Sequence, residues 1–303
     1  MGRPYSVAAS SAVELAFVGP VRSATVVAAT PHATYFQVAD PDHTLFCLAS
    51  AAAVRVPCAV ILESKALPPQ LPEGTIATVG GGVLSIGGDP DGRAGGSGVT
   101  VFRASRWWRP PRPRGLGAVA PARLAGAVRW LTGRVADPLD AAGRTAVADL
   151  VEALAAGERP GPAVSRLLGR GPGLTPTGDD VLAGALVTLS ALGSPLTAML
   201  GHAVLAAAPD ATTAVSAGLL RRAAAGECIP QLADVLSAVG DGGADPAAGA
   251  LPRAAGALLA VGHCSGAGLL HGVLVAVAIA HARLANGVLR LAPPSPAATS
   301  AAA

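Results

Sequence analysis

The stretch GRGPGLTPTGDD, residues 169–180, combines residue types that can bind a ligand: glycines, hydroxyl side chains and two adjacent aspartates. The glycines allow the backbone to approach a ligand closely. Backbone amides at a helix N-terminus attract phosphate or carboxylate groups, whereas Asp179 and Asp180 repel them. Both features are compatible if a divalent cation such as Mg²⁺ lies between the carboxylates and an anion, or if the aspartates accept hydrogen bonds from an amide or carbamoyl group.

Helix capping is the structural alternative for this stretch. Thr177 can cap a helix through the Asp180 amide, with the Asp180 carboxylate reaching back as in a capping box. Capping explains Asp180, but it explains neither Asp179 nor the glycines. No Walker A or dinucleotide-binding pattern is present. We therefore predict a binding loop in which Asp179 is a site residue and Asp180 both caps the helix and contributes to the site.

The pattern recurs further along the chain, because TGDDVLAGALV (177–187) aligns without gaps to SGAGLLHGVLV (265–275). Either two helix N-termini face one site, or the repeat reflects small-residue helix packing or chance. The second copy has no aspartate. It also overlaps GHCSG (262–266), a G-x-C-x-G pattern in which Cys264 could act as a nucleophile with His263 or His271 as base. A nucleophile elbow needs a preceding strand, but AAGALLAVG favours a helix, so a packed thiol is the default interpretation of Cys264.

The period of the apolar pattern changes along the chain. Residues 12–104 have strand signals, including two hairpins around Asp40-Pro41-Asp42 and around the glycines at 80–82. Their short connections favour antiparallel pairing, because parallel pairs need longer crossovers. Residues 118–290 have helical periodicity, and several segments end in glycine. The predicted fold class is α+β, with an N-terminal antiparallel β-rich domain followed by a mainly α-helical domain.

The domain boundary is predicted at WWRPPRPRG, because this proline- and arginine-rich segment can form neither a helix nor a central strand. Its tryptophans could stack on single-stranded nucleic acid, but anchoring of the linker is the better interpretation of one isolated cluster. The predicted organisation is a β-rich domain at 1–108, a linker at 109–117, a helical domain at 118–292 and a disordered tail at 293–303.

Composition narrows the class of protein. Only 14% of the residues are charged, the mean hydropathy is +0.50 and the net charge is +3. A chain this apolar is a core-rich globule or lies in a membrane. Both long uncharged runs are interrupted by glycine or proline, which favours a soluble helical domain over a membrane protein. The four scattered cysteines and the absence of a signal-peptide pattern are typical of a cytoplasmic protein, and the small net charge does not indicate a nucleic-acid partner.

The motifs GPGLTPTGDDVLAG, ATTAVSAGLL and GHCSGAGLLHGVL resemble the family of the AllH-like subunit of oxamate carbamoyltransferase. The resemblance covers most of the chain and implies a role in purine and allantoin nitrogen catabolism. It implies phosphorolysis of oxalurate to oxamate and carbamoyl phosphate by a multi-subunit enzyme. The family's second motif carries an acidic residue where this chain has Gly268, so a second carboxylate is missing here.

Together these patterns predict a carbamoyltransferase-type subunit that works with partner subunits and binds a small anion: oxalurate, oxamate, phosphate or carbamoyl phosphate. A non-catalytic binding or scaffolding subunit is the alternative. No cofactor is indicated apart from a divalent cation at the aspartates. The candidate catalytic residues are Asp179 and Asp180. The candidate substrate-binding residues are Gly171, Gly173, Thr175, Thr177, Gly178, Thr212, Thr213, Ser216, His263, Ser265 and Gly266.

Overall fold

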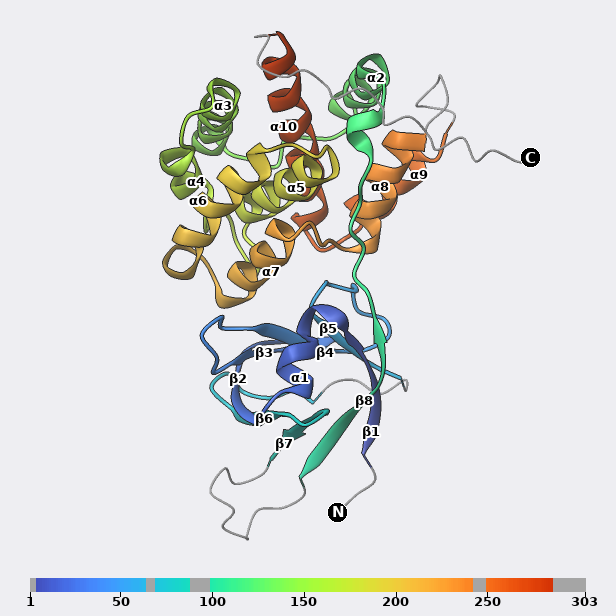
Figure 1. Ribbon diagram of the computed structural model, residues 1–303, viewed down its shortest axis with the longest axis vertical. Coiled ribbons are helices and arrows are strands. Elements are labelled where there is room, and N and C mark those ends of the chain that lie inside the picture. Colours follow the sequence, from blue (N-terminus) through green and yellow to red (C-terminus); the bar gives the residue numbers. More distant parts are fainter. Residues whose placement is uncertain (1–3, 64–68, 88–98, 242–248, 286–303) are drawn as a thin grey trace, which may run out of the picture.

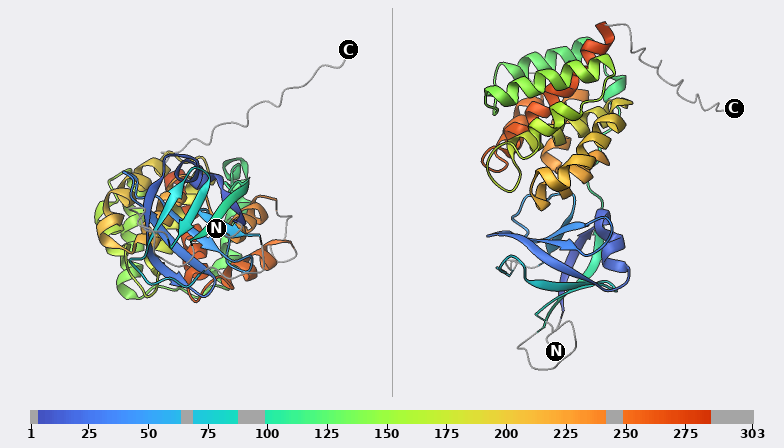
Figure 2. Two further views of the ribbon diagram at one scale, coloured as in Figure 1. Left: turned by 90° about the horizontal axis from the view of Figure 1, so that it is seen from below. Right: turned by 90° about the vertical axis from the view of Figure 1, so that its left-hand side faces the viewer.

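A computed structural model of the chain describes residues 4–63, 69–87, 99–241 and 249–285. The strands lie in the N-terminal third and the longer helices follow them in the chain. Figure 1 shows the strands gathered in one part of the molecule and the helices α2–α10 in another, with the chain after β8 passing between them. Figure 2 shows the same two parts stacked end to end.

The strands of the described residues form a closed barrel in the order β1-β5-β4-β3-β2-β6-β7-β8, with β8 pairing back to β1. Alternating burial along β2 and β3 places every second side chain inside the barrel. The strand bounds are β1 Tyr5–Ser10, β2 Arg22–Thr30, β3 Ala33–Val38, β4 Leu45–Ala49, β5 Ala59–Leu62, β6 Ile76–Gly80, β7 Val83–Ile86 and β8 Thr100–Trp108.

The predicted fold class is wrong, because the sheet is a closed barrel of mixed direction and not an antiparallel β domain. The pairs β1·β8 and β4·β5 are parallel. Residues 50–58 connect β4 to β5, and an extended segment of that length reaches about 30 Å, which is enough to return along strands of four or five residues. The rule that parallel pairs need long crossovers therefore fails for such short strands. For β1·β8 the rule gives no prediction, because these two strands are the first and the last of the barrel and are not joined by a single connection.

Both predicted hairpins are confirmed. β3 pairs with β4 across the turn at Asp40–Asp42, and β6 pairs with β7 across the glycines at 80–82. The barrel interior is filled by aromatic rings, with Phe36 stacked on Phe46 at 5.0 Å between centroids and Phe17 edge-on to Phe46 at 5.4 Å. Phe17 belongs to the short helix α1 (Glu14–Val18), which therefore closes one end of the barrel core.

The helices after the barrel surround α5, whose residues are buried on nearly every side. Such a helix needs no amphipathic pattern, since neighbouring helices cover all of its faces. The helix bounds are α2 Pro121–Thr132, α3 Ala141–Ala156, α4 Gly161–Leu167, α5 Thr177–Ala191, α6 Leu196–Ala211, α7 Ala214–Ala224, α8 Pro230–Asp241, α9 Leu251–Leu259 and α10 Ser265–Ala285.

The segment after β8 is attached at both ends. Trp108 Nε1 donates to the Ala59 carbonyl at 3.3 Å within the barrel, and the Arg55 guanidinium lies over the Trp108 ring. Beyond it, the Cys228 amide donates to Pro111 O at 3.1 Å, and Arg112 pairs with Glu227. Trp107 and Trp108 are the last two residues of β8 and pair with β1, so the prediction that WWRPPRPRG forms no strand is wrong for these two residues. The domain boundaries themselves stay a prediction. The predicted disordered tail at 293–303 lies outside the described residues.

Within the described residues, one helical stretch, Ser265–Arg283 of α10, is long and apolar enough to cross a membrane by length and composition. Half of it is buried inside the structure, and α10 packs along α5. The core helix of a soluble protein passes the same test, so the predicted cytoplasmic location stays a prediction.

Candidate functional site

Helix α5 begins at Thr177, with Pro176 as the N-cap residue and no side-chain capping bond. The amides of Asp179 and Asp180 donate to Pro176 O at 2.9 and 3.1 Å, and the Gly178 amide donates to Arg170 O at 2.9 Å. The predicted capping box is therefore wrong. Because these three amides are already satisfied within the chain, they do not form an open phosphate cradle.

Asp179 is the centre of a buried hydrogen-bond network. Its side chain is 1% exposed and accepts from the Gly169 amide at 2.8 Å, from Ser216 Oγ at 2.6 Å and from Thr212 Oγ1. Burial raises the pKa of Asp179, and the bonds from Ser216, Thr212 and Gly169 act in the opposite direction. Asp179 thus ties the glycine loop and the start of α7 to α5.

Asp180 faces a cavity instead. It is 7% exposed, and its Oδ2 atom has no hydrogen-bond partner among the described residues. The cavity has a volume of about 190 Å³, below the roughly 300–1,000 Å³ of drug-sized pockets, so it suits a small metabolite. Beside Asp180, the hydroxyls of Thr175 and Ser265 are hydrogen-bonded to each other at 2.8 Å.

The cavity walls are mainly apolar and come from both parts of the molecule. Tyr35 and Val56 belong to the barrel, while Val187, Leu219 and Leu269 belong to α5, α7 and α10. Burial in these surroundings raises the pKa of Asp180 to about 8. The polar interaction with the Ser265 hydroxyl lowers the pKa, the negative charge of Asp179 raises it, and the polar interaction with the Thr175 hydroxyl lowers it. At neutral pH the Asp180 side chain is therefore mainly the uncharged acid, which can donate as well as accept a hydrogen bond.

The internal repeat marks two helices that pack side by side with the same chain direction. Thr175 meets Ser265 where α5 and α10 begin, and further on a Cβ at Gly184 would collide with Leu269 O, as one at Gly272 would with Val181 O. The two contacts are equivalent, because in the repeat Gly184 corresponds to Gly272 and Val181 corresponds to Leu269. Both interpretations of the repeat are therefore compatible with the geometry: glycines allow the close packing, and the two N-termini lie together beside the cavity.

Gly268 occupies the position equivalent to Asp180 in the second copy and lies directly against it. A Cβ at Gly268 would stand 2.7 Å from Asp180 Cβ and 3.1 Å from Thr177 O. With this packing, a side chain at Gly268 has no room. The missing second carboxylate thus leaves Asp180 as the one carboxylate contributed to the cavity by the repeat.

We predict that Gly272→Ala weakens the contact between α5 and α10. The added methyl group would meet Val181 O, Ala185 N at 2.7 Å and Gly184 Cα at 2.8 Å, all backbone atoms that can yield only if a helix moves. The expected loss is about 1–3 kcal/mol of unfolding free energy, measured by urea denaturation. Gly256→Ala in α9 is the control, because a Cβ there meets nothing within 4 Å and alanine favours the helix by up to about 1 kcal/mol. Equal stability of the two variants would contradict the packing.

The other predicted site residues divide into packing and loop positions. Thr213 caps α7 through the Ser216 amide at 3.0 Å and donates to Leu174 O at 2.6 Å, and Thr177 Oγ1 contacts Cys264 Sγ at 3.5 Å. His263 is exposed on the turn before α10, outside the cavity lining. The four glycines have structural reasons for lacking a side chain. Gly171 and Gly173 have positive φ angles of +111° and +92°, and Gly178 and Gly266 pack against carbonyl groups of the preceding helices.

Glu227 is a buried carboxylate of the cavity wall that sequence reasoning missed. It is 3% exposed and pairs with Arg112 from the linker and with Arg222 of α7 at 3.6 Å. The surrounding sequence, GECIP, contains no recognisable motif. Of the two partners of Glu227, Arg112 is remote in the sequence and Arg222 lies on the preceding helix, so the sequence contains no signal for this residue. Its ion pairs join the linker to α7, whereas Asp180 has no such cation beside it in the cavity lining.

The structure does not show the geometry expected for a metal site at Asp179 and Asp180 or for a nucleophile at Cys264. Within the described ranges, no group of three or more His, Cys, Asp or Glu residues could hold a metal ion. Asp179 and Asp180 also point to different partners, since Asp179 is engaged by three donors. Cys264 follows helix α9 and not a strand, so the G-x-C-x-G pattern lacks the context of a nucleophile elbow.

Comparison with protein families gives one match, which covers part of the chain. Residues 167–277 match the family model of oxamate carbamoyltransferase subunit AllH. The match includes every candidate site residue, from Gly171 to Gly266, while the barrel lies outside it. The predicted resemblance is thus confirmed for this segment, which is AllH-like. No curated protein and no solved structure matches the chain significantly.

Proposed function

We propose that this AllH-like chain is a subunit of a carbamoyltransferase-type enzyme and that the cavity at Asp180 binds the carbamoyl group of a small substrate such as oxalurate or carbamoyl phosphate. One observation carries the proposal. Asp180 Oδ2 is buried without a partner in a small apolar cavity, although an unsatisfied buried polar atom costs about 1–3 kcal/mol. A ligand that hydrogen-bonds to this atom recovers that cost.

A carbamoyl group offers a carbonyl oxygen and an NH₂ group, and the cavity offers groups for both. The uncharged Asp180 donates to the carbonyl oxygen, and the hydroxyls of Thr175 and Ser265 accept from the NH₂ group. When a nucleophile adds to the carbonyl carbon, negative charge develops on that oxygen. Asp180 and the positive N-terminal ends of α5 and α10 then stabilise the charge, and a protonated aspartate in an apolar site is suited to this donor role.

The composition of the cavity supports a shared active site. Its described lining contains no Arg, Lys or His, so no cation faces the carboxylate or phosphate part of the substrate. We infer that a partner subunit supplies those cations and that this chain supplies the carbamoyl pocket. A binding subunit without catalytic groups is the second candidate, because Glu227, the other carboxylate of the lining, is held in ion pairs.

Binding of oxalurate to the full chain tests the proposal, with and without partner subunits, by titration calorimetry. Oxalate, which has no amide, should bind at least about tenfold more weakly than oxalurate. Asp180→Ala should lose this preference. Asp180→Asn should keep most of it, because the amide still donates a hydrogen bond. The control is Asp210→Ala, an exposed position at the end of α6.

If Asp180→Asn loses binding as completely as Asp180→Ala, the carboxylate acts as an acceptor and the donor role is wrong. If neither substitution changes oxalurate binding to the chain and its partners, the cavity is not the carbamoyl site. Turnover only in the presence of partner subunits would favour the shared site, and turnover unaffected by Asp180 substitution would favour the binding-only subunit.

A further inference from the structure

The cavity at Asp180 is elongated along helix α5. Asp180, Ala183 and Val187 all line it, and these positions share one face of the helix because they are spaced by three and four residues. With a rise of about 1.5 Å per residue, this face extends the cavity over about 10 Å. A ligand whose carbamoyl group lies at Asp180 therefore has room for a further group toward Val187.

Glu227 lies at the end of the cavity that is remote from Asp180. It belongs to the lining, and the adjacent Gly226 packs on the C-terminal part of α5, where a Cβ at Gly226 would stand 2.7 Å from Ser190 Oγ. Asp180, by contrast, lies in the first turn of α5. The two carboxyl groups can therefore contact different parts of one ligand.

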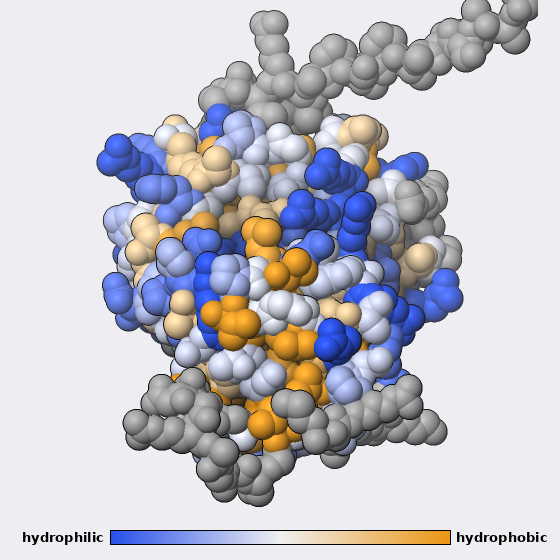
Figure 3. All heavy atoms as spheres, turned by 60° about the horizontal axis from the view of Figure 1, so that its bottom comes forward, coloured by the Kyte–Doolittle hydropathy of each residue, from blue (hydrophilic) through white to orange (hydrophobic). Residues whose placement is uncertain are grey.

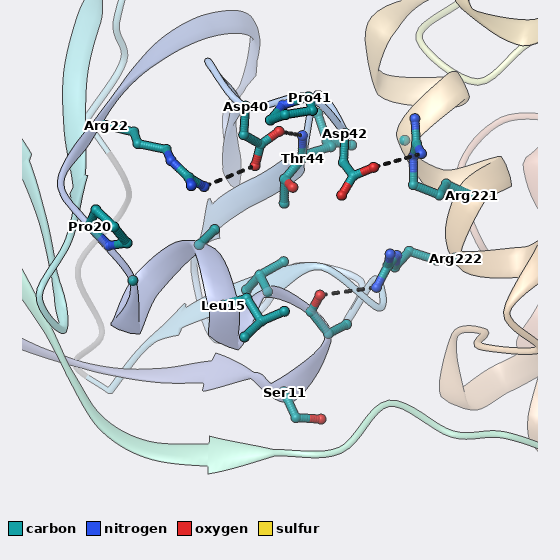
Figure 4. A pocket seen from close by; sticks show the side chains of 16 residues that line it. Ser11, Leu15, Pro20, Arg22, Asp40, Pro41, Asp42, Thr44, Arg221 and Arg222 are labelled. Atoms are coloured by element: carbon teal, nitrogen blue, oxygen red, sulfur yellow. Dashed lines mark hydrogen bonds and ion pairs between the residues drawn. The ribbon is translucent and has the colours of Figure 1, made fainter.

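One oxygen of the Glu227 carboxylate is engaged and the other has no donor. Oε1 accepts from Arg112 Nε at 3.2 Å, whereas Oε2 is buried and has no hydrogen-bond partner among the described residues. Arg222 Nη1 is 3.6 Å from Oε2, beyond hydrogen-bond distance, and donates instead to the Ala12 carbonyl at 3.0 Å (Figure 4). Arg112 thus fixes the carboxylate, and Oε2 is left as an acceptor that an N–H group of a ligand can satisfy.

The more open surface of the molecule offers no such acceptor. The larger cleft between the barrel and α7 has a volume of about 700 Å³, but its described lining contains no buried side-chain oxygen without a partner. Its arginines face carboxylates, as Arg22 does Asp40 (Figure 4). The apolar side chains on the face where the barrel comes forward are open to solvent (Figure 3). The cavity along α5, in contrast, contains two unsatisfied oxygens, Asp180 Oδ2 and Glu227 Oε2.

We propose that Glu227 determines ligand specificity by accepting, through Oε2, a hydrogen bond from an N–H group at the far end of the ligand. The ligand is then a ureide with its carbamoyl group at Asp180 and an amide or amine N–H toward Glu227. This inference rests on the proposed function, because Asp180 must hold the carbamoyl group. A methyl or ester group at the far end leaves Oε2 unsatisfied, which lowers the affinity.

Biuret and N-acetylurea are matched probes, because they share the carbamoyl group and differ only in an NH₂ or a CH₃ group at the far end. Titration calorimetry with the full chain should show biuret bound at least about tenfold more tightly than N-acetylurea. Glu227→Ala should reduce this ratio to about one, with N-acetylurea binding changed by less than about threefold. Glu227→Gln keeps a carbonyl oxygen and should keep most of the preference. Asp180→Ala should weaken both probes alike.

Arg112→Ala is the control for a structural role of Glu227. It removes the ion pair at Oε1 and leaves Oε2 in place, and Arg112 is outside the cavity lining. The preference for biuret should therefore persist in this variant. Equal affinities of the two probes for the unmodified chain would overturn the role of Glu227 and leave the proposed function intact. Equal losses of the preference in Arg112→Ala and Glu227→Ala would also overturn it. If neither probe binds, the cavity is not a carbamoyl site, and both proposals are wrong.

Discussion

Replacement of Asp179 by alanine is expected to lower the free energy of unfolding by about 3–5 kcal/mol, because three buried donors lose their acceptor at once. These donors are the Gly169 amide and the hydroxyls of Thr212 and Ser216. They come from the glycine loop, the α6–α7 connection and α7, so the substitution loosens three segments around α5. Chemical denaturation followed by circular dichroism measures the loss.

Two further variants separate the network from a general effect of removing a charge. Ser216→Ala removes one donor and leaves the carboxylate bonded to the others, so its expected cost is about 1–2 kcal/mol. Asp210→Ala, at an exposed position near the end of α6, should change stability by less than about 0.5 kcal/mol. If Asp179→Ala is as stable as Asp210→Ala, Asp179 does not hold the loop and its role as a site residue regains support.

The sequence could locate the site but could not assign the two aspartates. Adjacent residues on a helix point about 100° apart, so Asp179 and Asp180 can have different surroundings, and in the structure only Asp180 lines the cavity. Which one does so depends on where α7 and α10 pack, and neither position follows from the local motif. The cluster of Thr175 and Ser265 was foreseeable, because the gapless repeat suggested that the two helix N-termini face one site.

The fold was predictable where pairing is local. Both hairpins join segments separated by a short turn, and the turn residues identified them. Barrel closure was not predictable, because β1·β8 pairs Tyr5 with Phe102 across most of the N-terminal part. The cavity wall depends on similar long-range contacts, since Tyr35 and Val56 of the barrel line the same cavity as Asp180. The family match, which is restricted to residues 167–277, does not include these two residues.

Substitution of Asp180 by asparagine is expected to change how stability depends on pH. In the unfolded chain the pKa of an aspartate is about 3.9, whereas burial raises the pKa of Asp180 in the folded chain to about 8. Between these values the folded state retains a proton that the unfolded state has lost. Each pH unit of increase therefore lowers the free energy of unfolding by about 1.4 kcal/mol. This contribution is complete below about pH 4 and is lost as the pH rises to about 8.

Asparagine does not titrate, so Asp180→Asn should gain about 4 kcal/mol relative to the unmodified chain between pH 5 and pH 8, or roughly 10 °C in Tm. The difference between the two proteins is the quantity to measure, because other titrating groups contribute almost equally to both. Asp210→Asn should show no such change, since that side chain is exposed. Parallel stability curves for Asp180→Asn and the unmodified chain would mean that Asp180 is already ionised at neutral pH. In that case it could not donate the hydrogen bond proposed for the carbamoyl oxygen, and an acceptor role toward the NH₂ group would replace it.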